Sequence, residues 1–469
     1  MKSIRIIASA CLPLLLAACA ATQPRPAPEP AIPLGWSAPL PHNGSVADLA
    51  QWWQQQNDPV LVGLIAAAQR VSPTLAAAVS RIKQARATQV ASAAALLPTL
   101  DAAASIGRTS QQSAMPLGTT AQAALQGGWE IDLFGGNRAA RRGAQARFEG
   151  AQAGWHEARV SVAAEVAQRY YSLRACEKLL NVSRADAASR GETSRLVQLS
   201  ANAGFQSPAA AGLARASAAE GNGRVTQQSA LCDIDIKALV ALTAIEETPL
   251  RQQIASVPGA LPPAANISIV SLPAQILAQR PDVFTAEREV AAAAADVDVA
   301  QAQRYPRLSL TGSIGLARFS GGGVSTNLET WSIGPLALTV PLFDGGGRSA
   351  NADAAAARYT EAEIKYRGSV RQAVREVEEA LVNLNSTALR GADAATAVEG
   401  YRASFNGIES RYKNGLASLV ELEDARRIRL AAETALVSLQ RERVAAWIAL
   451  YRAAGGGWNS ADLNATRTQ

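Results

Sequence analysis

The chain has 469 residues, of which 48% are hydrophobic and 18% are charged. Its 45 basic and 39 acidic residues are interspersed, and a formal charge of +6 spread in this way argues against a nucleic-acid-binding protein. Of the two histidines, His156 is followed by Val160 where a zinc protease would need its second histidine, and segment 344–349 lacks the lysine of a phosphate-binding loop. We therefore expect a protein that is not an enzyme, with no catalytic residues, no metal site and no nucleic-acid partner.

Residues 1–18 have the features of a secretory signal peptide. Lys2 and Arg5 precede an apolar stretch that ends at Leu16 and is too short to span a bilayer. The run LAAC, which ends at Cys19, resembles a bacterial lipobox and implies that Cys19 carries a diacylglycerol and a fatty acyl chain. Ala20 favours delivery to the outer membrane, because lipoproteins retained in the inner membrane carry Asp there. A chance cysteine is the alternative.

Residues 19–50 are predicted to be the lipid anchor and a tether. Seven prolines fall between residues 22 and 41, a density that forces an extended, polyproline-like conformation. A folded body then begins near Trp52, and residues 456–469 form a C-terminal tail. No segment of this body reaches the roughly 18 uninterrupted apolar residues of a membrane helix.

The folded body repeats itself at a separation of about 210 residues. IDLFGGNR at 131–138 returns as VPLFDGGGR at 340–348, and several other landmarks recur in the same order. Such repetition indicates a tandem duplication. We assign the first repeat to residues 51–260 and the second to residues 261–455.

Each repeat is predicted to contain a helix, a β-hairpin and a long helical hairpin. The β-hairpins carry polar loop tips, expected at 111–119 and 320–328. In the first repeat, the β-hairpin is placed at 98–134 and the helical hairpin at 138–245. In the second repeat, they are placed at 306–343 and 348–454.

Segment 123–133, in the first β-hairpin, alternates as membrane strands do. Leu125, Trp129, Ile131 and Leu133 alternate there with polar or small residues, which are Gln126, Gly128, Glu130 and Asp132. Successive side chains of a strand point to opposite faces, so one face is oily and the other polar, as in a transmembrane β-barrel. Segment 308–316 repeats this pattern, whereas segment 331–342 alternates poorly and contains Pro335 and Pro341. A half-buried sheet of a soluble protein is the alternative.

Four strands, the number in one chain, cannot close a barrel, and a barrel of eight strands would be filled by side chains. Three copies with twelve strands are therefore the first assembly that encloses a pore.

The helical segments are unusually long. Segments 138–200 and 348–412 contain no proline, and at 1.5 Å per residue each would extend about 95 Å. Their apolar residues recur at helical spacing, and many are alanine, which lets helices approach closely. The predicted fold class is mainly α with a membrane β-barrel: a tandem duplicated unit whose trimeric 12-stranded β-barrel is continuous with a long α-helical coiled-coil barrel.

Four stretches carry a family resemblance: QWWQQQNDPVLVGLIAAA at 51–68, AQRPDVFTAEREVAAAAADVDVAQAQRYPRLSLTGSIG at 278–315, VPLFDGGGRSANADAAAARY at 340–359 and RYKNGLASLVELEDAR at 411–426. Together they resemble the TolC-like outer-membrane efflux proteins, and within them the lipidated NodT-type branch. The resemblance implies a homotrimer, lipid-anchored in the cell outer membrane and extending into the periplasm. It also implies a passive exit duct for small molecules such as drugs in a tripartite efflux system. The implied partners are a periplasmic adaptor protein and an inner-membrane transporter of the RND type. A periplasmic adaptor lipoprotein and a structural coiled-coil stalk are the alternatives.

The tips of the helical hairpins have the strongest local signals. Gly415 suits the left-handed residue that closes a helix, and Ser418 with Glu421 fits the S-x-x-E capping box of the next. Ser207, followed by proline, starts a helix in the first repeat. The resemblance matches Glu421 and Asp424 to acidic positions of the family's aperture, where three copies of each would form carboxylate rings at a periplasmic gate. A capping residue and a solvated charge are the alternatives.

The same tip region docks the adaptor in the family. This implies docking residues in both repeats: Arg411, Tyr412, Gly415, Ser418, Gly204 and Ser207.

The two remaining cysteines flank the first tip symmetrically. Cys176 lies 28 residues before Gly204, and Cys232 lies 28 residues after it. In an antiparallel hairpin that turns at Gly204 the two would be level, and a disulfide is possible if their faces meet. Two buried free thiols are the alternative.

Overall fold

The computed structural model describes residues 30–38, 52–111, 115–257 and 273–459. The signal peptide, Cys19, most of the tether and most of the C-terminal tail lie outside the described residues, so these assignments remain predictions.

The chain forms two compact units, which we call the sheet unit and the hairpin unit. The sheet unit contains Val79–Gln152 and Phe284–Ser369. The hairpin unit contains Ala31–Ala78, Ala153–Val283 and Val370–Gln469. Each repeat therefore contributes residues to both units.

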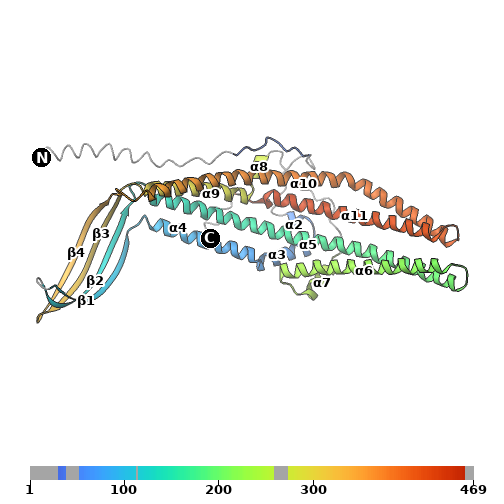
Figure 1. The fold of residues 1–469 in the computed structure, drawn as a ribbon, viewed down its shortest axis with the longest axis horizontal. Coiled ribbons are helices and arrows are strands. Elements are labelled where there is room, and N and C mark those ends of the chain that lie inside the picture. Colours follow the sequence, from blue (N-terminus) through green and yellow to red (C-terminus); the bar gives the residue numbers. More distant parts are fainter. Residues whose placement is uncertain (1–29, 39–51, 112–114, 258–272, 460–469) are drawn as a thin grey trace. The chain divides into compact units, whose positions relative to one another are not determined.

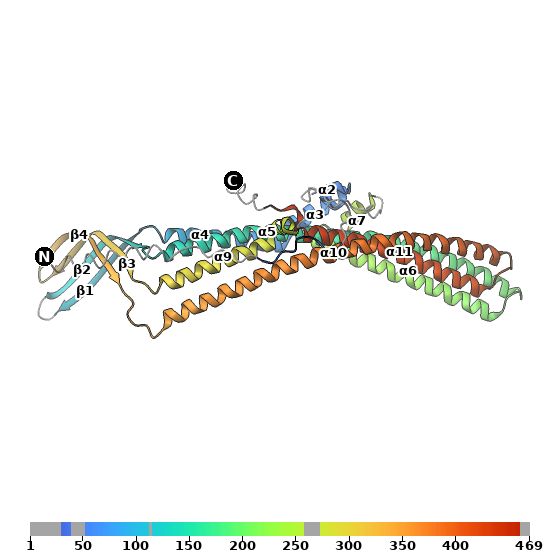
Figure 2. The ribbon, with the colours of Figure 1, turned by 90° about the horizontal axis from the view of Figure 1, so that it is seen from above.

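The sheet unit is built on one antiparallel sheet in the order β1-β2-β3-β4 (Figure 1; Figure 2). Its strands are β1 Thr99–Gln111, β2 Met115–Ile131, β3 Arg307–Gly321 and β4 Val324–Thr339. β1 pairs with β2 inside the first repeat, and β3 pairs with β4 inside the second. The pairing of β2 with β3, from Gly118↔Gly321 to Ile131↔Leu308, joins the two repeats into one continuous sheet.

The loops at the far ends of the β-hairpins are shorter than the sequence suggested. β2 begins at Met115, and only Gly322 and Gly323 separate β3 from β4. Both glycines have positive φ, 59° and 83°, as in the two-residue turns whose twist matches the flanking strands. The prediction of a loop over 320–328 was wrong because Ser325–Asn327, although polar, pair with β3.

β4 is a strand despite its weak alternation. A register shift between Leu310 and Gly312 of β3 lies opposite Pro335. Proline has no N–H to donate to a ladder, and it is tolerated at such an irregularity and on edge strands. β4 is an edge strand of this sheet.

Four helices run from the sheet unit. α4 (Pro73–Ala94) and α9 (Pro281–Ala302) precede the two β-hairpins, while α5 (Gly136–Asn202) and α10 (Gly347–Lys413) follow them. Small side chains let these helices pack closely, since Val297 and Ala300 of α9 are buried in one cluster with alanines of α10. Ion pairs tie α5 to α9, with 3.0 Å between Arg142 Nη2 and Asp298 Oδ2. This is the alanine-rich, close helix packing that the sequence predicted.

The hairpin unit contains two long helical hairpins. α5 returns as α6 (Pro208–Thr243), and α10 returns as α11 (Leu419–Ala453), as the chain colours show in Figure 1. α5 and α10 each have 67 residues, or about 100 Å at the usual helical rise.

The hairpin unit also contains an apolar core. α2 (Trp52–Gln55) and α3 (Pro59–Val71) pack there with α7 (Glu247–Ala255), and α8 (Pro273–Ala278) also contributes a buried residue. The rings of Trp52 and Tyr451 stack at 5.2 Å. Part of the predicted tether also packs here, because Ala38 is buried in the same core and the N–H groups of Ser37 and Ala38 donate to the Glu378 carboxylate.

Among the helices of the described ranges, no single one is long and apolar enough to cross a membrane. One pair, α3 with α4, passes that test only when taken together, and it is bent by 49°.

Candidate functional sites: the hairpin tips and the sheet

The first tip, residues 200–210, turns at a glycine. Gly204 has φ of +80°, and the N–H of Phe205 donates to the carbonyl of Ser200 at 2.8 Å. Ser207 then caps α6, because its hydroxyl accepts from the N–H of Ala210 at 3.1 Å. Proline at the first helical position completes this start, as predicted.

The second tip, residues 411–424, is built in the same way with more polar contacts. Gly415 has φ of +75°, and the guanidinium of Arg411 donates to the carbonyl of Leu416 at 2.9 Å. Ser418 and Glu421 form the predicted capping box, in which each side chain bonds the other residue's backbone N–H at 3.1 and 2.7 Å. Arg411, Gly415 and Ser418 therefore shape this turn.

The two candidate gate residues are both exposed. The hydrogen bond from the Ser418 N–H, together with the Ser418 side chain and the nearby Arg411, holds the pKa of Glu421 below its ordinary range. Asp424 Oδ1 lies 3.1 Å from Arg427 Nη2, and both side chains are mostly in solvent. Both carboxylates are therefore accessible to solvent, and each has a structural partner.

Tyr412 links the two tips. It packs with Val197 of α5 and Ala211 of α6, and it also packs with Phe405 and Leu422 of the second hairpin. Burial raises the pKa of its phenol. Tyr412 thus joins the hairpins through apolar contact rather than standing free at the surface.

Three apolar side chains of the tips are open to solvent. Phe205 is 83% exposed, Leu416 is 69% exposed and Val420 is 59% exposed. The residues named from the sequence mostly form the turns, whereas these three, which sequence reasoning missed, present the surface. Phe205 and Leu416 directly follow the tip glycines, and this position could have revealed those two.

The first hairpin is closed by a disulfide. Cys176 of α5 and Cys232 of α6 are bonded, with 5.5 Å between their Cα atoms. Both side chains are buried, so the bond lies inside the packed seam of the hairpin.

A buried network of charged side chains lies between the two hairpins. Arg190 of α5 contacts Asp186 at 2.8 Å and Glu423 of α11 at 2.7 Å. Arg426, whose side chain is 0% exposed, pairs with Glu423 and donates to Thr193 at 3.0 Å. We call this group of charged side chains, with Arg224 and Arg429, the charge network.

The sheet separates apolar from polar side chains as its register requires. Paired residues share a face, and the row Ala102, Leu125, Ile314 and Trp331 is apolar throughout. The same face carries further exposed apolar side chains, at Leu100, Ile106, Trp129, Leu316, Ile333, Leu336 and Leu338. The next row, on the opposite face, is polar: Asp101, Gln126, Ser313 and Ser332.

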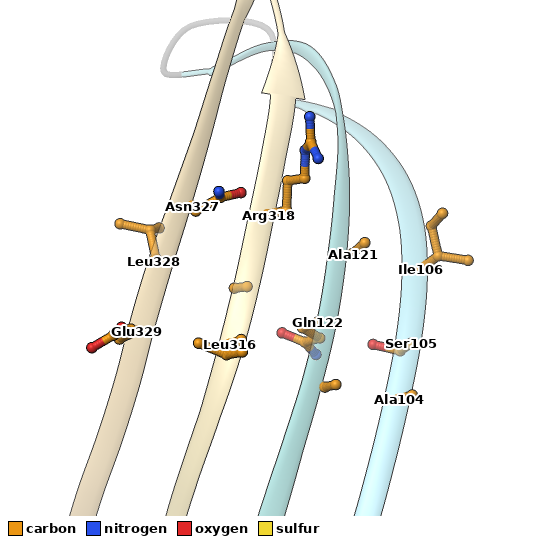
Figure 3. Close-up of a pocket in the computed structure, with 12 residues that line it drawn as sticks. Ala104, Ser105, Ile106, Ala121, Gln122, Leu316, Arg318, Asn327, Leu328 and Glu329 are labelled. Atoms are coloured by element: carbon orange, nitrogen blue, oxygen red, sulfur yellow. The ribbon is translucent and has the colours of Figure 1, made fainter.

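The apolar face has the height of a membrane. From Leu308 to Leu316 along β3 it extends about 26 Å at the usual strand rise, close to the ~25 Å apolar band of outer-membrane strands. Toward the β3–β4 turn the face becomes polar, and Figure 3 shows Arg318 beside Asn327 on neighbouring strands. Figure 3 also shows the lining of a hollow of about 1040 Å³, to which all four strands contribute. The hollow is open to solvent, so it is a shallow depression on the sheet rather than an enclosed pocket.

No group of three His, Cys, Asp or Glu side chains in the described part of the chain is placed to hold a metal ion.

A family model for outer membrane efflux proteins matches residues 64–243 and 272–456. The chain belongs to this family. It is 29% identical to the pyoverdine export outer membrane protein OpmQ of Pseudomonas aeruginosa over 479 residues, covering 98% of each chain. It is also 29% identical to nodulation protein T of Rhizobium leguminosarum bv. trifolii over 460 residues, covering 95% of this chain and 96% of that protein. Among solved structures, the outer-membrane channel OprN superposes with a TM-score of 0.82 at 27% identity, covering 92% of this chain and 99% of OprN.

Family membership confirms several predictions. Outer membrane efflux proteins are channels and not enzymes, and this chain is an outer-membrane exit duct for efflux. The family works with adaptor and inner-membrane pump partners. The mainly helical fold with one β-sheet is the TolC-like fold. Neither a periplasmic adaptor nor a simple stalk is supported.

Proposed function

We propose that three copies of this chain, each anchored by lipid on Cys19, close a twelve-stranded β-barrel and form the exit duct of a tripartite pump. The observation that carries the proposal is the sheet, whose apolar face is continuous across β2 and β3. Its two outer strands, β1 and β4, each have only one partner strand within the part of the chain that the structure describes. A strand edge in lipid leaves N–H and C=O groups unsatisfied, so β1 of one copy would pair with β4 of the next.

The gate is proposed at the second tip. Glu421 and Asp424 are exposed, and three copies of each would place six carboxylates around the axis. Such rings attract cations and narrow the entrance. The first tip has Ala210 and Leu213 at the matching positions, so the acidic rings would come from the second hairpin alone.

Adaptor docking is proposed at both tips. Phe205 and Leu416 would make apolar contact with the adaptor, because each is a large apolar side chain exposed at the turn of a hairpin tip. The residues nominated from the sequence would hold those side chains in place. Tyr412 would do so by packing between the two tips, and the others through the turns: Gly204, Ser207, Arg411, Gly415 and Ser418. An RND-type transporter would supply the energy.

The cargo is proposed to be small molecules without strong selection by the duct. OpmQ is named for pyoverdine export, and the relative TtgI of Pseudomonas putida is named for toluene efflux at 28% identity. Two relatives that are almost equally similar to this chain are thus named for the export of chemically different compounds. This suits a duct that does not select its cargo, with the specificity residing in the transporter.

Conductance in planar bilayers tests the gate. The double variant Glu421→Ala with Asp424→Ala is expected to raise the conductance or reduce the cation preference, because the carboxylate rings are removed. Glu192→Ala is the matched control, since Glu192 is also exposed and also pairs with an arginine three residues later, at 2.8 Å. Unchanged currents in the double variant would remove the gate assignment.

A further inference from the structure

The apolar face of the sheet ends in a band of polar and charged side chains. Along β3 its last large apolar residue is Leu316, and the next two residues on the same side are Arg318 and Ser320. On β1 the register places Arg108 level with Ser320, through Thr119 of β2. Two arginines therefore lie on one side of the sheet, between the apolar face and the turns.

The Arg318 side chain points toward the turn end of the sheet. Its Nε donates to the hydroxyl of Ser325 at 3.2 Å, and Ser325 pairs with Ser320, which is nearer to the turn than Arg318 is. Figure 3 shows the guanidinium directed along β3 in this way. Within the described residues, no other hydrogen bond or ion pair holds the guanidinium of Arg318 or that of Arg108. Both side chains are exposed, so both can bind a ligand.

The two arginines lie at the depth of lipid headgroups if the apolar face contacts lipid. Strand residues two positions apart are separated by about 7 Å, so Arg318 lies about 7 Å and Arg108 about 13 Å beyond Leu316 along the strands. Headgroups add about 5–8 Å to each side of a hydrocarbon core. Because barrel strands tilt by about 35–45°, the two arginines are closer to the core when depth is measured along the membrane normal.

The turn end of the sheet faces the outside of the cell in the proposed duct. In the sheet unit, α4, α5, α9 and α10 all join the strands at the opposite end, and in the duct these helices lead into the periplasm. Within the described strands, the apolar side of the sheet carries one further charge, the carboxylate of Glu329, which is level with Leu316. Arg307, at the helix end of β3, lies on the polar face. The two cations of the apolar side are therefore both at its outer end.

This placement suits phosphate groups at the outer surface of the membrane. A guanidinium binds phosphate oxygens through two parallel hydrogen bonds. Arg108 and Arg318 are two strands and two residues apart, which places their Cα atoms about 12 Å from each other. The outer leaflet of a bacterial outer membrane contains a glycolipid whose sugars carry phosphates. One such headgroup can contact both guanidiniums.

We propose that Arg108 and Arg318 of each copy bind the phosphates of an outer-leaflet glycolipid, whose acyl chains lie against the apolar face. This inference rests on the proposed lipid contact of that face. Apolar side chains below and two guanidiniums above fit one molecule in which oily chains are joined to a phosphorylated headgroup. A free phosphate would contact the guanidiniums alone and would gain nothing from the apolar side chains beside them.

Native mass spectrometry of the full-length trimer in detergent measures the binding. The probe is lipid A with both phosphates, and the reference is the same lipid A without phosphates. We expect the unmodified trimer to prefer the phosphorylated form. Arg108→Gln with Arg318→Gln is expected to weaken binding of that form about 25-fold, and either change alone about 5-fold, the size associated with one arginine near an anionic lipid surface. Added salt should weaken binding to the unmodified trimer more than to the double variant.

Two further variants separate the position of a charge from its sign. Arg307→Gln is the matched control, because Arg307 is an exposed arginine of the same strand on the opposite face, and it is expected to leave the binding unchanged. Glu329→Gln removes the acid of the apolar side and is expected to strengthen the binding, because the net positive charge increases. If the double variant does not assemble into trimers, the two single variants decide.

Three results would overturn the assignment. They are binding of phosphorylated lipid A by the double variant as tight as by the unmodified trimer, equal weakening in Arg307→Gln or Glu329→Gln, and displacement of the lipid by inorganic phosphate, which would show a site for a free anion. Failure of the proposed function gives a different result. If Leu125→Arg reaches the outer membrane normally, the face does not contact lipid and both proposals fall. Depletion of Leu125→Arg, together with unchanged lipid A binding in the double variant, would overturn this inference alone.

Discussion

The two helical hairpins have almost equal lengths but are held together by different means. α5 and α6 have 67 and 36 residues, and α10 and α11 have 67 and 35. The first hairpin has a disulfide 28 residues from its tip glycine on each side. At that distance from Gly415 the second has Thr387 and Arg443, and its nearby cross-link is the exposed ion pair of Arg390 and Glu442.

This difference means that the two copies of the duplicated unit are stabilised to different degrees. A disulfide that closes a loop of this size contributes about 4 kcal/mol in the chain-entropy model, whereas an exposed ion pair contributes about 0–1 kcal/mol. The first hairpin therefore has a covalent restraint, whereas the second, which carries Glu421, Asp424 and Glu423, contains no cysteine and is held by non-covalent contacts.

The largest expected effect comes from the disulfide. Replacing Cys176 and Cys232 with alanine should destabilise the first hairpin by about 4 kcal/mol, because the unfolded chain regains the entropy of a loop spanning 56 residues. Thermal unfolding followed by circular dichroism, with and without reductant, measures this. Arg390→Gln with Glu442→Gln is the control and should change the free energy of unfolding by less than about 1 kcal/mol. Equal losses in the two pairs of variants would refute the comparison.

The sheet should show the opposite result, with both repeats responding alike. Leu125 and Ile314 are paired on the apolar face, and an arginine at either should cost about 2–4 kcal/mol if it faces the middle of a bilayer. Both variants should be depleted from the outer-membrane fraction. Gln126→Arg and Ser313→Arg, one residue away on the polar face, should insert normally. Equal depletion in all four would show that the apolar face does not contact lipid.

The tip glycines should also respond alike. Gly204→Ala and Gly415→Ala force a Cβ into a left-handed conformation and should each cost about 1–2 kcal/mol. Gly407→Ala, inside α10 and free of close neighbours, should instead stabilise by about 0.5–1 kcal/mol. Hydrogen exchange of the turn amides measures the difference. A turn that tolerates alanine as well as position 407 does would contradict the structure.

The smallest expected effect is a pH-dependent change in the stability of the second tip that the first tip does not share. The pKa of Glu421 is lowered below its ordinary value of 4.5 by the bonds with Ser418, so the ionised capping box contributes stability above that value. This contribution is lost as the pH falls through the lowered pKa. Amides 419–422 should then exchange faster, while the first tip, capped by Ser207 without an acid, should not change. Ser418→Ala should remove the pH response and cost about 1 kcal/mol. An equal pH response at both tips would count against this account.

Local signals made much of this structure predictable. Gly415, Ser418 and Glu421 lie within seven residues, so the turn and the capping box depend on chemistry that a short segment contains. Cys176 and Cys232 could be paired because the symmetry about Gly204 supplies the geometry. Strand faces followed from alternation alone, although the extent of β4 did not.

Long-range contacts were not predictable in the same way. Arg426 is a basic residue among other charged residues, and its full burial depends on α5, 233 residues away at Thr193. The charge network was missed for that reason. The pairing of β2 with β3 was missed because alternation fixes which face a side chain takes and not which strand lies beside it.

The central claim is that one chain supplies four strands with a lipid-facing side and that three chains pool them around a pore. Native mass spectrometry of the purified protein in mild detergent tests this most directly. The account predicts a trimer as the dominant species, and a folded protein that remains a monomer under these conditions would contradict it.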